Sequence, residues 1–249
     1  MSRIGELARL IAESKNTVFF GGAGVSTESG IPDFRSEAGL YAAQENYGYA
    51  PEELLSHSLF RREPGLFFRY YQENLIHVDA KPNAAHLALA ELERRGLMQA
   101  VITQNIDGLH QAAGSEWVFE LHGSNWRQYC MACGVKYDLA YTLDAVNCKD
   151  GVPVCAACGG LVRPDVVLYG EGLDETVVSA SVHAISRAEL LIVGGTSLAV
   201  YPAAGLLGYF KGDALVLINK SETPADRHAR FVIHDAIGEV LGEALACLH

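Results

Sequence analysis

The sequence lacks any hydrophobic run long enough to cross a lipid bilayer. The apolar run Leu190–Val193 is ended by Gly194 and Gly195, whereas a membrane-spanning helix needs roughly 20 consecutive apolar residues. A secretory signal is not expected either, because the apolar residues of Ile4–Ile11 recur with the spacing of an amphipathic surface helix. We therefore expect no membrane segment and a cytoplasmic location.

Basic residues are also scarce. The chain of 249 residues contains 19 Lys and Arg against 30 Asp and Glu, which gives a net charge of −11. Such a charge repels the phosphates of nucleic acids and anionic membranes, and it permits cationic partners such as lysine-bearing peptides. With 49% hydrophobic residues and no repeat or low-complexity segment, the chain is expected to be compact. We predict a monomer with no direct nucleic-acid partner.

Four of the six cysteines form two pairs with metal-ligand spacing. Two residues separate Cys130 from Cys133 and Cys155 from Cys158, with 21 residues between the pairs. Two such turns can complete a tetrahedral thiolate set for Zn²⁺. A redox motif and a pair of disulfides are the competing interpretations, but two copies without a secretory signal favour a metal in a reducing compartment. Because four thiolates leave no open coordination position, we predict one structural Zn²⁺ and two ordinary thiols.

A glycine-rich segment, residues 22–36, directly follows the apolar run Thr17–Phe20. A strand that leads into closely spaced glycines lets backbone N–H groups approach a phosphate. The match to a dinucleotide fingerprint is incomplete, because Thr27 stands where a third glycine is expected. A tight turn without a ligand is therefore the alternative. Further along, Phe34 and Arg35 offer an aromatic face and a permanent cation, so we favour a nucleotide site.

Short apolar runs alternate with helical patterns along most of the chain. Strands that are covered on both faces read as continuous apolar runs. The sequence predicts strands at Thr17–Phe20, Ala100–Thr103, Trp117–Leu121, Val166–Leu168, Leu190–Val193, Leu215–Asn219 and Phe231–Ile233. Helices are predicted at Asn83–Arg95 and Asp174–Arg187. This alternation indicates an α/β fold with a doubly wound parallel, Rossmann-like sheet.

Two segments interrupt the alternation and are predicted to form a second, smaller domain. Residues 37–81 are rich in aromatic residues with helical spacing, and residues 124–163 contain the cysteine pairs. We expect a helical insertion and a zinc-binding insertion that pack together. The Rossmann-like domain is then made of residues 1–36, 82–123 and 164–249.

Polar residues follow several of the predicted strands. Gln104 follows one strand, His122 follows the next, and Thr196 comes shortly after a third. In a doubly wound sheet, ligands bind outside the carboxyl ends of the strands. We therefore expect amide, hydroxyl, carboxylate and imidazole groups to surround one crevice.

These motifs, taken in order, resemble the signature blocks of the sirtuins, a family of NAD-dependent protein deacylases. The resemblance extends from about Ile4 to Ala244, and its blocks are Gly22–Ser36, Thr103–His110, Leu121–Gly123, the two cysteine pairs, Tyr169–Glu171 and Gly195–Pro202. It implies that the acyl-lysine oxygen attacks the nicotinamide-bearing ribose carbon of NAD, that nicotinamide leaves, and that the acyl group ends on ADP-ribose. Because Phe67–Asn74 lacks the Tyr-x-x-Arg pair that holds acidic acyl groups, acetyl or a longer apolar acyl group is favoured over succinyl.

The resemblance also implies roles for individual residues. His122 would be the general base, Asp107 and the backbone of Ile106 would hold the nicotinamide carboxamide, and Asn105 would orient ribose or an attacking group. Further NAD contacts would come from Ala23, Gly24, Thr27, Phe34, Arg35, Gln104, Gly195, Thr196, Ser197, Asn219, Asp235 and Ala236. For Asn105 and Asp107, helix capping is the alternative.

The substrate peptide would add as a strand between Gly170–Leu173 and Leu198–Tyr201. The substrate contacts predicted are Val166, Val167, Gly170, Gly172, Val200 and Tyr201. An NAD-dependent ADP-ribosyltransferase on the same scaffold, a zinc-ribbon interaction module and an ordinary dehydrogenase are the alternatives to a deacylase.

Overall fold

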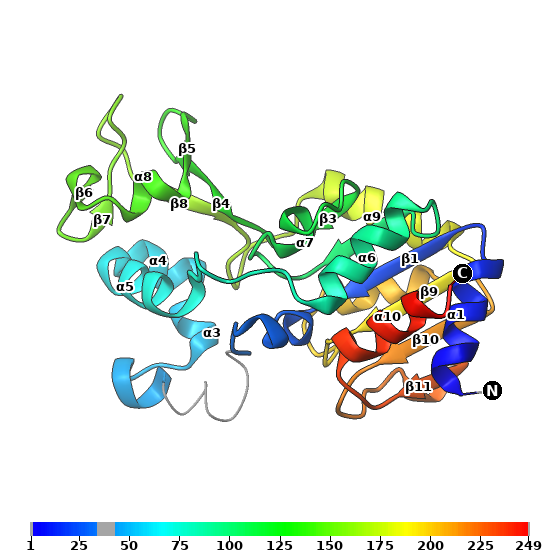
Figure 1. The fold of residues 1–249 in the computed structure, drawn as a ribbon. Helices are drawn as coiled ribbons and strands as arrows, with labels where there is room; N and C mark the ends of the chain where they lie inside the picture. The colour runs from blue at the N-terminus through cyan, green and yellow to red at the C-terminus, as the bar shows by residue number, and fades with distance from the viewer. Residues whose placement is uncertain (1, 34–42, 249) are drawn as a thin grey trace.

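A six-stranded parallel sheet forms the centre of the larger part of the molecule (Figure 1). The computed structural model describes residues 2–33 and 43–248. The strand order is β11-β10-β9-β1-β2-β3. The bounds are β1 (Thr17–Gly21), β2 (Ala100–Thr103), β3 (Val118–Glu120), β9 (Leu190–Gly194), β10 (Ala214–Ile218) and β11 (Phe231–Ile233). The order reverses beside β1, as expected for a doubly wound sheet.

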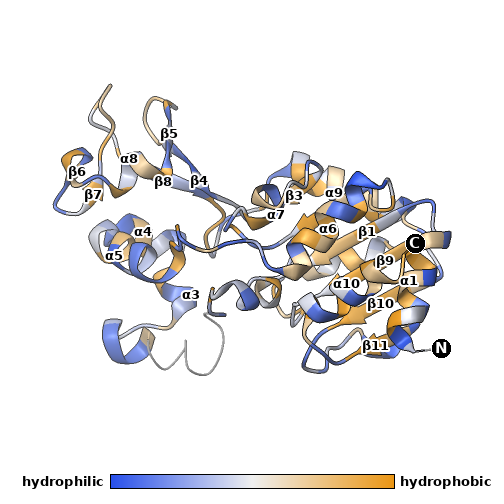
Figure 2. Cartoon of the chain, viewed as in Figure 1, coloured by the Kyte–Doolittle hydropathy of each residue, from blue (hydrophilic) through white to orange (hydrophobic). Residues whose placement is uncertain are grey.

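Helices cover both faces of this sheet. Alternate side chains of β1 point to opposite faces, so Phe19 packs in one core cluster while Val18 and Phe20 pack in another. The first face is covered by α1 (Arg3–Glu13), α6 (Ala84–Arg94) and α10 (Ile237–Ala246), with α7 (Leu109–Ala112) beside α6, and the second face by α9 (Glu175–Arg187) and the 3₁₀ segment Ala203–Tyr209. The apolar strands lie between helices whose outer surfaces are more polar (Figure 2).

Two predicted helices, α6 and α9, begin directly after the residue whose side chain caps them. Asn83 caps α6 through Ala85 N–H and His86 N–H, and Asp174 caps α9 through Thr176 N–H and Val177 N–H. The amphipathic N-terminal pattern forms α1 as predicted. Within the described residues, no helix is long and apolar enough to cross a membrane.

A small lobe, made of α3–α5, α8 and β4–β8, lies to one side of the six-stranded sheet (Figure 1). Its helices are α3 (Pro51–Leu54), α4 (His57–Arg62), α5 (Pro64–Leu75) and α8 (Leu139–Leu143). Its strands are β4 (Gly123–Cys130), β5 (Lys136–Asp138) and β8 (Val162–Val166), which form an antiparallel sheet, and the short pair β6 (Cys148–Lys149) and β7 (Val152–Pro153). Shorter 3₁₀ turns occur at Ala23–Val25, Thr27–Ser29, Ala145–Asn147 and Asp226–His228. The division into domains at the residues given above stays a prediction.

One predicted strand is wrong in position and in sheet. Val166–Leu168 was expected among the parallel strands, but the strand is β8, Val162–Val166, and it pairs antiparallel with β4 in the small lobe. The apolar pattern is hidden because Arg163 and Pro164 interrupt it, and Arg163 is buried through an ion pair rather than through apolar character. The hydrophobic run after the strand instead lines a pocket.

Two buried histidines, His86 in α6 and His110 in α7, lie next to each other. Their ring centroids are 4.8 Å apart, and neither ring nitrogen of His110 has a hydrogen-bond partner among the described residues. Burial, and to a lesser degree the neighbouring His86, lower the pKa of His110 to about 3. Burial also lowers the pKa of His86. The folded state therefore favours neutral rings.

This pair is expected to make folding sensitive to acid. An unfolded histidine has a pKa of about 6.5, so below that pH the unfolded chain binds protons that folded His110 does not. The stabilisation is complete above about pH 6.5 and is lost as the pH falls toward 3. For His110 alone, the free energy of unfolding should fall by about 2 kcal/mol between pH 7 and pH 5. Denaturant unfolding of wild type and His110→Leu measures this difference, and the same pH dependence in both proteins would refute it.

Candidate functional site

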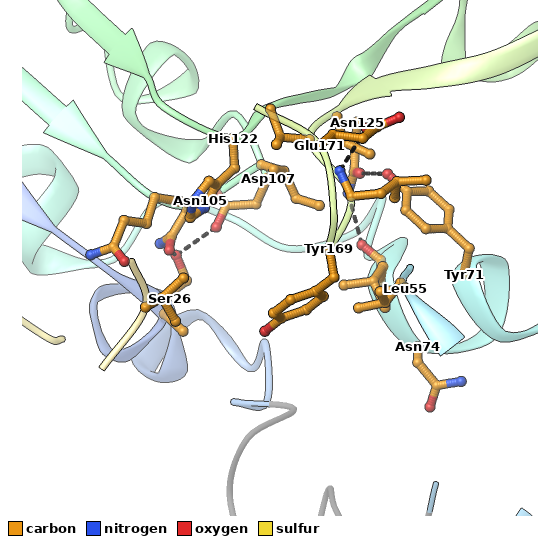
Figure 3. Close-up of a pocket in the computed structure, with 18 of the residues that line it drawn as sticks. Ser26, Leu55, Tyr71, Asn74, Asn105, Asp107, His122, Asn125, Tyr169 and Glu171 are labelled. Atoms are coloured by element: carbon orange, nitrogen blue, oxygen red, sulfur yellow. Dashed lines mark hydrogen bonds between the residues drawn. The ribbon is translucent and has the colours of Figure 1, made fainter. Parts of the chain in front are cut away.

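A pocket lies between the carboxyl ends of the parallel strands and the small lobe (Figure 3). The strand register aligns Gly21 with Thr103 and with Gly194, so the loops after β1, β2 and β9 leave the sheet side by side. The sequence-predicted residues that line the pocket are Ala23, Gln104, Asn105, Ile106, Asp107, His122, Val166, Val167, Gly170, Val200 and Tyr201. The predicted convergence of polar strand ends is thus present.

Ser26 links the carboxylate of Asp107 to the side-chain amide of Asn105 at this edge of the pocket. Its hydroxyl donates to Asp107 Oδ2 at 2.7 Å and accepts from Asn105 Nδ2 at 3.0 Å (Figure 3). Asp107 Oδ1 also accepts from Leu109 N–H at 2.8 Å at the start of α7. The N-cap residue of α7 is Gly108, however, so Asp107 supports the turn into this helix without being its N-cap. Ser26 was not among the predicted site residues, although its place in the glycine segment could have indicated it.

The ring of His122 has a defined tautomer in its neutral form. Nδ1 lies 2.8 Å from the backbone oxygen of Gln104. Because a carbonyl oxygen only accepts, Nδ1 carries the proton and Nε2 carries the lone pair. A basic Nε2 is what a proton-accepting imidazole requires.

Gly123 follows His122 with a φ of +78°, and a Cβ there would lie 2.0 Å from the Asp165 oxygen. Only glycine therefore lets the chain leave His122 and enter β4.

The glycines of the first loop are needed for packing between loops. A Cβ on Gly24 would lie 2.8 Å from Gly195 Cα, and one on Gly22 would lie 2.8 Å from Thr196 Cβ. Gly24 N–H donates to the Gly195 oxygen at 2.8 Å. The buried Gln104 amide then donates to the Thr196 hydroxyl at 3.0 Å. The glycines thus let the loops after β1 and β9 pack together, and Gln104 joins the loop after β2 to them. The prediction of phosphate approach did not consider this packing role.

Several predicted cofactor residues are not among those that line this pocket. They are Gly24, Thr27, Gly195, Thr196, Ser197, Asn219, Asp235 and Ala236. Glu28 joins two of these regions, because its carboxylate accepts from Gly238 N–H at 3.0 Å at the start of α10, next to the Asp235–Ala236 turn. Phe34 and Arg35 lie outside the described residues. Gly172 lies between the lining residues Glu171 and Leu173.

The opposite wall of the pocket comes from the small lobe and from the loop after β8. Leu55, Leu168 and Tyr169 contribute apolar surface, and Tyr71 donates from its hydroxyl to Asn125 Oδ1 (Figure 3). Burial raises the pKa of Tyr71 far above its usual range, so its hydroxyl is neutral. Asn125 in turn donates to the Leu75 oxygen at 2.8 Å. Leu55 and Asn125 were not among the predicted contacts, since only the fold brings the helices of the small lobe and β4 to this pocket.

A buried ion pair holds the lining segment that follows β8. The Arg163 side chain is only 5% exposed, and its two terminal nitrogens donate to the Glu171 carboxylate at 2.6 and 2.9 Å. Leu168 N–H donates to the same carboxylate at 2.9 Å. Burial opposes the charge of Glu171, yet these hydrogen bonds keep its pKa below the usual range.

Removing Glu171 should therefore destabilise the fold. In Glu171→Ala the Arg163 charge stays buried without its partner, and we expect the free energy of unfolding to fall by about 3 kcal/mol. The control variant Glu13→Ala breaks the exposed ion pair with Arg9. It should change the free energy of unfolding by no more than about 1 kcal/mol. Urea unfolding compares the two variants. An equal loss of unfolding free energy in both variants would show that the buried Arg163–Glu171 pair stabilises the fold no more than an exposed pair does.

The four paired cysteines converge at the end of the small lobe. Their sulfur atoms all lie within 4.8 Å of one another, with 3.5 Å between Cys130 and Cys158 and 3.6 Å between Cys133 and Cys155. A tetrahedral centre with Zn–S bonds of about 2.3 Å places its sulfurs about 3.8 Å apart. The hydroxyl oxygen of Tyr137 lies 3.0 Å from Cys155 Sγ, and this hydrogen bond lowers the pKa of Cys155 to about 6. The set therefore fits Zn²⁺, as predicted.

Comparison with known families decides what this arrangement belongs to. The model described as the Sir2 family matches residues 22–202, which contain the first loop, the polar strand ends and the cysteine cluster. The chain belongs to the Sir2 family. A family member from Clostridium acetobutylicum, named NAD-dependent protein deacetylase, is 57% identical over 241 residues, with 97% of each chain covered. A protein of the same name from Cutibacterium acnes is 55% identical over 236 residues, with 95% of each chain covered.

Solved Sir2 structures share the fold over nearly the whole chain. One, with a p53 peptide and NAD⁺, has a TM-score of 0.88 and 39% identity and covers 99% of this chain and 98% of its own. Another, bound to an acetylated peptide, has a TM-score of 0.87 and 38% identity with the same coverage. The predicted Rossmann-like sheet with a four-cysteine module is thereby confirmed for this Sir2-family member.

Proposed function

We propose that this Sir2-family protein is an NAD-dependent protein deacetylase that acts on acetyl-lysine. The observation that carries the proposal is the meeting of Asn105, Asp107 and His122 at one edge of a pocket whose opposite wall is apolar. A dehydrogenase or a zinc-ribbon interaction module has no use for this arrangement. The names of the relatives that are 55–57% identical, and the Sir2 structures with peptide and NAD⁺, support the same function.

The residues present fit NAD along the ends of β1, β2, β9 and β10. When bound, NAD supplies a glycosidic bond to nicotinamide that can be broken and an ADP-ribose that takes up the acyl group. We assign the carboxamide of nicotinamide to Asp107 and to the backbone of Ile106, and a ribose hydroxyl to Gln104. The assigned phosphate, ribose and adenosine contacts are Ala23, Gly24, Thr27, Phe34, Arg35, Gly195, Thr196, Ser197, Asn219, Asp235 and Ala236.

His122 is assigned as the general base. With Nδ1 held by the Gln104 oxygen, its Nε2 lone pair can accept a proton from a ribose hydroxyl. Asn105, held by Ser26, is assigned to orient the attacking group, and a held amide reduces the ordering required at the moment of reaction.

Acetyl-lysine is assigned to the apolar wall. The side chain would pass Val166, Val167 and Tyr169, while the peptide backbone adds as a strand between Gly170–Leu173 and Leu198–Tyr201. Gly172 and Val200 would make backbone contacts, and Tyr201, which is 75% exposed, would cover the peptide. Among the described residues that line the pocket, none is Lys or Arg. Within the described part of the chain, a succinyl carboxylate therefore meets no Lys or Arg side chain at this wall.

Reaction with an acetyl-lysine peptide in the presence and absence of NAD tests the proposal. We expect deacetylated peptide and nicotinamide only when NAD is present, with acetyl or longer apolar acyl peptides reacting faster than succinyl peptides. ADP-ribosylated protein without deacetylation would refute the proposal and support the transferase alternative. Removal of acetyl without NAD would refute both.

The cysteine cluster is assigned to one structural Zn²⁺, since the set offers four thiolates and no position for substrate. The substrates are then acyl-lysine proteins or peptides. We further propose that the protein is a cytoplasmic monomer that binds no nucleic acid, and that residues 37–81 and 124–163 form its smaller domain.

A further inference from the structure

Trp126 is a large aromatic residue of β4 that burial does not explain. It is 49% exposed, yet its indole Nε1–H donates to the backbone oxygen of Asp107 at 2.7 Å. The ring also lies against the α-carbon of Gly108, because a Cβ there would be 2.6 Å from Trp126 Cδ1 and Nε1. Gly108 has a φ of +75°, so the ring covers the point where the backbone turns from Asp107 into α7.

The contacts of β4 with this loop are consecutive. Asn125 N–H donates to the Ile106 oxygen at 2.9 Å, the Trp126 indole donates to the Asp107 oxygen, and the Trp126 ring covers Gly108. Two neighbouring residues of β4 therefore fix three neighbouring residues of the loop. The carboxylate of Asp107 is held separately, by Ser26 and Leu109 N–H. Within the part of the chain that the structure describes, the backbone carbonyls of residues 106 and 107 accept these hydrogen bonds from β4.

We propose that Trp126 is a positioning residue that sets the backbone of Ile106–Gly108 for recognition of the nicotinamide carboxamide. The inference rests on the proposed function, which assigns that carboxamide to the Ile106 backbone and the Asp107 side chain. A carboxamide is recognised by a few hydrogen bonds of defined direction, so a small displacement of this backbone weakens them. The contribution of Trp126 should therefore appear for ligands that carry nicotinamide and not for ligands that lack it.

Two substitutions separate the hydrogen bond from the ring contact. Trp126→Phe keeps an aromatic ring over Gly108 and removes the N–H, and the loss of one such hydrogen bond should weaken NAD binding by about 2- to 10-fold. Trp126→Ala removes both contacts and should have the larger effect. Trp117→Phe is the matched control, because Trp117 is 62% exposed and precedes β3.

Isothermal calorimetry with NAD and with ADP-ribose, in the absence of peptide, provides the test. ADP-ribose lacks nicotinamide, so its affinity should be the same in wild type, Trp126→Phe and Trp126→Ala, while NAD affinity falls in that order. In the deacetylation assay, KM for NAD and the inhibition constant of nicotinamide should rise with little change in KM for the peptide. Melting temperatures close to that of wild type should accompany these shifts.

An equal loss of affinity for NAD and ADP-ribose, or no loss for either, would overturn the role of Trp126. These binding measurements do not depend on turnover. A wild-type protein that fails to deacetylate any peptide would instead refute the proposed function, so the two failures can be told apart.

Discussion

Replacing His122 with alanine is expected to lower kcat/KM for deacetylation by about 10²- to 10⁴-fold, the usual contribution of a positioned general base. The reason is the tautomer that the fold imposes, since the Gln104 oxygen keeps the proton on Nδ1 and leaves the lone pair on Nε2. Because His122 is only partly buried, the variant should still fold. The rate of nicotinamide release with an acetyl-lysine peptide measures the effect.

His183→Ala is the control for this experiment, because His183 is an exposed residue of α9. It should leave the rate within about twofold of wild type, as surface substitutions usually do. An active His122→Ala variant with the same rate would remove the assignment of the base. A variant that loses NAD binding as completely as activity would show instead that His122 only holds the ligand.

Cys130→Ser is expected to weaken zinc binding by more than about 100-fold. Replacing a residue that only hydrogen-bonds to a metal ligand already lowers metal affinity by about 10- to 100-fold, and Cys130 is itself a predicted ligand. Cys130 ends β4, the strand that begins beside His122 and contacts the Asp107 loop through Trp126. Loss of the metal should therefore loosen the small lobe and lower activity. Zinc content per mole of protein, measured by mass spectrometry, and the temperature of thermal unfolding report these effects.

Cys247→Ser serves as the matched control, because this exposed cysteine lies at the end of α10 and outside the cluster. It should keep one zinc per chain and the wild-type unfolding temperature. Retention of a full zinc equivalent and normal folding in Cys130→Ser would contradict the four-cysteine centre.

The sequence was sufficient for the strands and helices whose patterns are local. Ala100–Thr103 and Phe231–Ile233 form strands with the predicted bounds, and Asn83 and Asp174 cap helices as their side chains allow. The strand β8 could not be placed, because burial of Arg163 depends on Glu171 in a later loop. A charged residue reads as surface until its partner is known.

The candidate site divides in the same way. The polar ends of neighbouring strands could be predicted, since parallel strands place their carboxyl ends at one edge. The contact of Tyr71 with Asn125 joins residues that are 54 positions apart, and the contact of Ser26 with Asp107 spans 81 positions. No periodicity or spacing indicates such pairs, because they arise from how the small lobe and the loops pack. The roles assigned to the predicted NAD and substrate contacts stay predictions.

The central claim is that acetyl removal is coupled to consumption of NAD. The most direct measurement is the stoichiometry of a single reaction, in which nicotinamide, deacetylated peptide and the product that carries the acetyl group are quantified together by mass spectrometry. The account predicts one nicotinamide for each acetyl group removed, with the acetyl group recovered on ADP-ribose. Nicotinamide release without loss of acetyl, or acetyl released without nicotinamide, would contradict it.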